Sequence, residues 1–85
     1  MTRKEVLEQA MTQICGDREE DYGTPEDNFG IIANFWSVYL GIPITRKDVA
    51  MLMVLMKTAR IKAGTKSDSF VDLAGYAACG AEVAE

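Results

Sequence analysis

The chain has 85 residues, of which 48% are hydrophobic, and it carries a formal net charge of −4. A chain of this length forms one domain, residues 1–85, and buries only about 60–65% of its unfolded surface. The negative charge argues against nucleic acid as a partner, and the lack of histidine excludes His-dependent triads and His-ligated metals.

Cysteine usage and hydropathy indicate the compartment. Cys15 and Cys79 lie far apart and lack CxxC spacing, which favours two buried, reduced thiols over a disulfide. The longest apolar run, residues 49–56, is too short to span a bilayer. No signal-type stretch follows the basic residues near the N-terminus. We therefore expect a cytoplasmic protein without a membrane partner.

Four helices are expected, over residues 2–15, 25–40, 46–63 and 68–84. Capping-box patterns at Thr2 and Thr45 begin the first and third, and Thr24 before a proline begins the second. Residues 16–23 are polar, acidic and flanked by glycines, which predicts a loop with at most one helical turn. The apolar run at 49–56 predicts that the third helix is the most buried. The fold class is therefore all-α, as a four-helix bundle or as paired helical hairpins.

The expected helix over residues 25–40 is apolar on two sides. One side carries Phe29, Ile32, Ala33, Trp36 and Leu40, and the other carries Ile31, Phe35 and Val38. We interpret its aromatic residues Phe29, Phe35 and Trp36 as core residues. A helix with two apolar faces is central to its bundle or lies at a subunit interface. Because so short a chain is so apolar, we expect homo-oligomerisation to complete the fold, most simply as a dimer.

Charged residues gather at the expected junction of the last two helices. Lys57 and Arg60 are three residues apart and Asp68 and Asp72 are four apart, so each pair shares a helix face. A turn at residues 64–67 would bring the two pairs together. This cluster predicts either a salt-bridge network or a pocket. In the pocket, the cations would hold a phosphate and a carboxylate would hold a ribose hydroxyl or a metal.

The acidic segment 17–23 supplies further candidates. Its four carboxylates are adjacent rather than spaced, which favours a solvated surface over a Mg²⁺ site. Arg18 and Tyr22 are of more interest, because an arginine and an aromatic ring can bind a phosphate and stack on a base. Plain packing is an equally good interpretation of Tyr22. The candidate ligand-binding residues are Arg18, Tyr22, Lys57, Arg60, Asp68 and Asp72.

Three motifs follow one another along the chain. They are REEDYGTPEDNF at 18–29, then Lys57-x-x-Arg60-Ile61, then Asp68-x-x-x-Asp72-x-x-Gly75-Tyr76. This combination resembles a family of small phage and prophage helical proteins, which implies a viral or prophage origin and a place in the bacterial host cell. A weaker likeness is to the MazG-type all-α nucleoside triphosphate pyrophosphatases, which bind Mg²⁺ through clustered Glu and Asp. Glu5-x-x-Glu8 and Asp68-x-x-x-Asp72 depart from the hallmark of that family.

Three functions are compatible with these patterns. The leading hypothesis is an oligomeric protein that binds a phosphate-bearing nucleotide and needs no cofactor. It is expected to be non-catalytic, because no nucleophile–base pair is visible. In a phage its role would be to sequester a signalling nucleotide of bacterial immunity. The second hypothesis is a Mg²⁺-dependent nucleotide pyrophosphatase. The third is a structural module whose second apolar face on residues 25–40 contacts a host protein.

Overall fold

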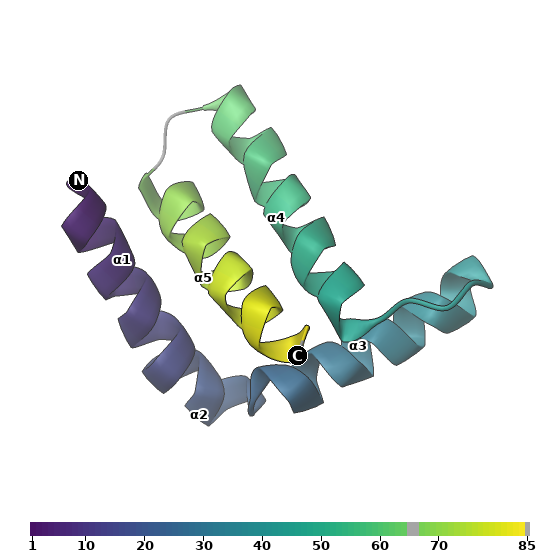
Figure 1. The fold of residues 1–85 in the computed structure, drawn as a ribbon. Coiled ribbons are helices and arrows are strands. Elements are labelled where there is room, and N and C mark those ends of the chain that lie inside the picture. Colours follow the sequence, from purple (N-terminus) through teal and green to yellow (C-terminus); the bar gives the residue numbers. More distant parts are fainter. Residues whose placement is uncertain (65–66, 85) are drawn as a thin grey trace.

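The computed structural model describes residues 1–64 and 67–84, and every regular element in these ranges is helical (Figure 1). In chain order they are α1 (Arg3–Thr12), the π-helical segment η1 (Gln13–Asp17), α2 (Arg18–Tyr22), α3 (Pro25–Leu40), α4 (Arg46–Ala63) and α5 (Ser67–Val83). Because α1, η1 and α2 follow one another without a break, they form one long helical body. The all-α class is confirmed.

Helix α5 lies at the centre of the molecule. It runs antiparallel to α4 as a hairpin, with α1 on its other side, while α3 crosses the ends of these helices (Figure 1). The expectation that α4 is the most buried helix is wrong. Val49 and Ala50 are buried, but Met51, Leu52 and Leu55 are exposed. The reason is that α4 contacts α5 and α3 with one face only, whereas α5 has neighbours on two sides.

Small residues on α5 allow its neighbours to approach closely. A Cβ atom added at Gly80 would lie 3.0 Å from the Cβ of Ala50 on α4. One added at Gly75 would lie 3.0 Å from the Cγ2 of Ile14 in η1. Both glycines are buried and lie inside α5, where glycine costs up to about 1 kcal/mol relative to alanine. Close contact on two sides therefore explains why glycine occupies these positions.

Local capping chemistry sets the helix starts. Thr2 and Thr45 each accept a hydrogen bond from the backbone N–H three residues on, and the acid at that position accepts one in return. The Thr24 hydroxyl accepts from the N–H of Asp27. The bounds of α3 and α4 coincide with those expected from the sequence. At the end of α3, Gly41 adopts the left-handed conformation, with φ 71°.

Residues 16–23 differ from the expected loop. The helix continues through them to Tyr22, and the break comes at Gly23, with φ 82°. The acidic side chains of this segment are exposed on the helix surface, so their density did not require a loop. Cys15 is also exposed rather than buried, whereas Cys79 is buried. Residues 65 and 66 of the expected turn lie outside the described residues.

The two apolar faces of α3 have different surroundings. Phe29 and Ala33 are buried in the core, where Ile32 and Trp36 pack against them. The opposite face is exposed, and Phe35 is therefore not the core residue that the sequence suggested. Within one chain, α3 is not central, because α4 and α5 both lie on the same side of it.

Candidate ligand-binding pocket

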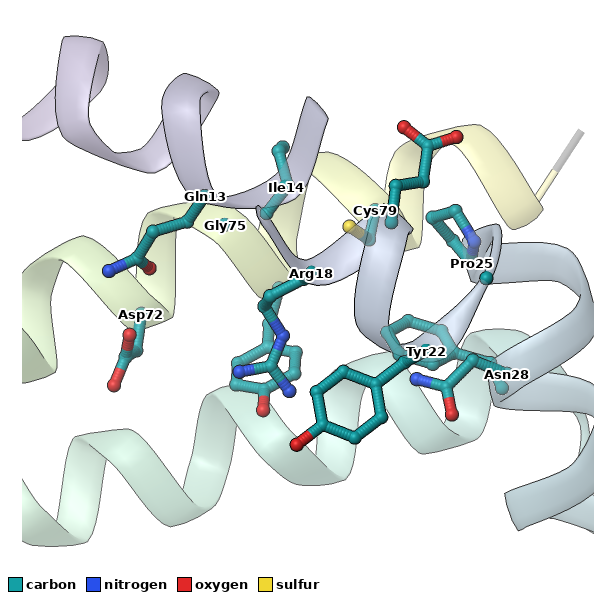
Figure 2. Close-up of a pocket in the computed structure, with 13 residues that line it drawn as sticks. Gln13, Ile14, Arg18, Tyr22, Pro25, Asn28, Asp72, Gly75 and Cys79 are labelled. Atoms are coloured by element: carbon teal, nitrogen blue, oxygen red, sulfur yellow. The ribbon is translucent and has the colours of Figure 1, made fainter. Parts of the chain in front are cut away.

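A hollow opens where η1 and α2, the start of α3 and the middle of α5 meet (Figure 2). Apolar atoms dominate its walls. Its lining residues are Gln13, Ile14, Arg18, Glu19, Tyr22, Gly23, Pro25, Asn28, Phe29, Asp72, Gly75, Tyr76 and Cys79. Its interior has a volume of about 40 Å³, and the wider hollow, with the open solvent at its mouth included, about 470 Å³. It therefore suits a flat group or a small anion rather than a large enclosed ligand.

The π-helical segment decides which side chains face the hollow. The N–H of Arg18 donates to the carbonyl of Gln13, five residues earlier instead of four. One extra residue in a turn rotates everything that follows by about 100° relative to a straight α-helix.

In a straight helix, Asp17 and Asp21 would continue the inward face of Ala10 and Ile14, at spacings of four, three and four. The π-turn gives that place to Arg18 and Tyr22 instead. This exchange was not predicted, because the sequence favoured a loop at these residues.

Arg18 lies against two tyrosine rings. Its guanidinium carbon is 5.3 Å from the ring centroid of Tyr22 and 5.8 Å from that of Tyr76. Figure 2 shows Arg18 beside Tyr22, with Asn28 beyond the ring and Asp72 on the other side. The Tyr76 ring stacks in turn on Phe29, with centroids 6.3 Å apart. Cation–π contacts of this kind orient a guanidinium while its N–H groups remain available.

Asp72 lies at the other end of the hollow, where it is paired with a cation. The Lys57 ammonium is 2.9 Å from Oδ2 of Asp72, and both side chains are largely buried. This contact joins α4 to α5, as expected for two helices in a hairpin. The pair neutralises itself, which leaves Arg18 as the lining cation without an acid partner among the described residues.

The six candidate residues do not form one cluster. Arg18, Tyr22 and Asp72 line the hollow, and Lys57 reaches it through its ion pair with Asp72. Arg60 and Asp68 are exposed, lie outside the lining and form no ion pair with any described residue. Tyr76 was named in the sequence motif that ends in Gly75-Tyr76 but was not among the candidate ligand-binding residues. Its position four residues after Asp72 places both on one face of α5, and this was the available signal.

Cys79 also lines the hollow. Burial, reinforced by the negative charge of Glu82, raises the pKa of its thiol above the ordinary value. The sulfur is therefore protonated at neutral pH and is a weak nucleophile. Over residues 1–64 and 67–84, no three acidic or cysteine side chains come close enough together to hold a metal ion.

Comparison with known proteins places this chain in a family. A family model described as "Domain of unknown function (DUF6378)" matches residues 5–84. The chain belongs to the DUF6378 family. The Gene 55 protein of Mycobacterium phage D29 is 51% identical over 75 residues, which cover 87% of this chain and 50% of that protein. The Gene 55 protein of Mycobacterium phage L5 is 42% identical over 74 residues, covering 85% and 47%.

These matches confirm the resemblance to a poorly characterised family of small phage helical proteins. This DUF6378 chain spans about half the length of the curated relatives it matches. No solved structure matches it. In the described ranges, no helix has both the length and the apolar character needed to cross a membrane.

Proposed function

We propose that this phage-type protein binds a phosphate-bearing nucleotide in the hollow between α2, α3 and α5, without transforming it. The observation that carries the proposal is Arg18, a guanidinium held against two tyrosine rings and without an acid partner in the described chain. A guanidinium in this state offers a charge-assisted, bidentate contact to a phosphate. The neighbouring Tyr22 ring is exposed apart from its contact with Arg18 and offers a surface on which a base can stack.

The rest of the lining suits the same ligand. Gln13 and Asn28 bring side-chain amides to the hollow, and an amide can both donate to and accept from the edge of a base. The small interior admits a ring or one phosphate, so the remainder of the nucleotide would lie in the mouth. The neutral Cys79 thiol supports binding rather than covalent chemistry. Sequestration of a signalling nucleotide of the bacterial host is the role we propose for such a binder.

Calorimetry with a panel of cyclic and linear nucleotides tests this proposal. We expect at least one to bind, and we expect Arg18→Ala to weaken it at least about tenfold, as loss of a hydrogen-bonded ion contact does. Arg60→Ala is the matched control, since it removes the same side chain from an exposed position outside the hollow. That variant should bind like the parent protein.

Three outcomes would contradict the proposal. One is the absence of binding to every nucleotide of the panel, and another is an equal loss of affinity in both variants. The third is release of phosphate or pyrophosphate from a nucleoside triphosphate in the presence of Mg²⁺. Such turnover, if abolished by Asp72→Asn, would favour the pyrophosphatase alternative instead.

A further inference from the structure

The outward side of α3 is the largest uncovered apolar feature along one element. We define the outer face of α3 as Ile31, Phe35, Val38 and Tyr39, together with Ile42 in the segment that follows the helix. These side chains are between 56% and 88% exposed. Three of them, at positions 31, 35 and 38, follow the four-three spacing with which one helix packs along another. The face therefore has the pattern of a helix–helix contact without the partner helix.

The area of the molecule points to the same missing contact. The chain exposes 6081 Å², whereas a folded monomer of 9.4 kDa exposes about 5,000 Å². The surplus of about 1,000 Å² is close to the roughly 800 Å² that each partner buries in an interface of standard size. The radius of gyration, 13.2 Å, likewise exceeds the approximately 12 Å expected for this length.

The charge pattern selects a second copy of the chain as the partner. Residues 28–45 contain no charged side chain, although the whole chain carries a net charge of −4. Across a two-fold axis every residue near the axis meets its own equivalent, so a charged residue there would face a like charge. An uncharged stretch avoids that repulsion. It also lacks the complementary charges with which a transient host partner would be recognised.

We propose that two copies of this protein pair through the outer face of α3, with the two helices antiparallel about a two-fold axis near Phe35. This arrangement would place Ile31 opposite the partner's Val38 and would bury both phenylalanine rings at the centre. Aromatic residues at the centre of an interface commonly contribute most of its binding energy. The proposal does not depend on the hollow, which is formed by η1, α2, the start of α3 and α5.

Sedimentation equilibrium of the full chain, at micromolar concentrations, tests the proposal. The parent protein should sediment as a species of about 19 kDa, twice the chain mass of 9.4 kDa. Phe35→Glu should raise the dimer dissociation constant at least about 30-fold, as for other residues that dominate an interface. Val38→Glu, on the same face, should act similarly, and it provides a second test if the first variant is unstable. Circular dichroism checks that each variant is folded.

Leu7→Glu on α1 and Leu55→Glu on α4 are matched controls. Both leucines are exposed to a similar extent, at 64% and 61%, and both lie away from the outer face of α3. These variants should remain dimeric. A monomeric parent protein would overturn the proposal. So would dimers that persist in folded Phe35→Glu and Val38→Glu, or a loss of dimer in all four variants, because the effect would then follow charge rather than position.

Discussion

Helices α3 and α5 both carry apolar residues on more than one side, yet they occupy opposite environments. On α5 the residues that face its neighbours include glycines, so α1 and α4 approach closely from two sides. On α3 the apolar residues are large, and only the face with Phe29 and Ala33 is covered. The comparison teaches that the size of the side chains, as well as their apolarity, decides whether a helix of a small chain becomes central.

The largest expected effect separates the two faces of α3. Phe29→Ala removes a ring that is 4% exposed and should lower the free energy of unfolding by about 3–5 kcal/mol. Phe35→Ala removes a ring that is 73% exposed and should change it by less than about 0.5 kcal/mol in the dilute monomer. Urea denaturation at low protein concentration measures both. Equal losses would mean that the faces are not distinct.

The next effect tests the close packing of α5. Gly80→Ala places a methyl group against the Cβ of Ala50, which has no side-chain rotation with which to move away. We expect a net loss of about 1–2 kcal/mol in urea denaturation, because overpacking exceeds the gain in helix propensity. Gly75→Ala meets a γ-carbon of Ile14, which can rotate, and should cost less. A variant at position 80 that is more stable than the parent would contradict the central role of these glycines.

A smaller effect concerns the end of α3, which supports its outer face. The Ser37 hydroxyl donates to the carbonyl of Ala33, 2.7 Å away, and accepts from the N–H of Ile44 at 2.8 Å. Ser37→Ala removes both contacts and should cost about 1 kcal/mol in unfolding free energy, since a half-buried N–H loses its partner. Ser37→Thr, which keeps the hydroxyl, is the control. An unchanged melting temperature for Ser37→Ala would show that the loop does not depend on this bond.

The smallest effect comes from the capped start of α4, beside the core face of α3. Hydrogen bonds from Thr45 lower the pKa of Asp48 below its usual 3.8. The folded state therefore binds that proton less readily than the unfolded state. Its contribution to stability is present above about pH 4 and is lost as the pH falls below that value. Asp48→Asn should flatten this acid dependence in urea titrations, and an unchanged slope would contradict the assignment.

The helices that the sequence predicted best are those with strong local signals. Thr24 and Thr45 mark starts and Gly41 marks an end, because caps act over a few residues. The Lys57–Asp72 contact was expected for a related reason, because a short turn between two helices brings their adjoining ends together. The position of α5 at the centre was not predictable from periodicity, because it depends on close contacts with α1 and α4 at Gly75 and Gly80. The site was only half predicted, since the orientation of Arg18 depends on a π-turn.

That π-turn makes the character of the hollow depend on the hydrogen-bond register of a single helical turn. Without the π-turn, residues 13–22 would continue as a regular α-helix, and the side chains after the turn would rotate by about 100°. Asp17 and Asp21 would then face α5 near Asp72, in the places of a guanidinium and an aromatic ring. A change in the register of one helical turn would thus replace a surface suited to anions with one suited to cations, with no residue added or removed.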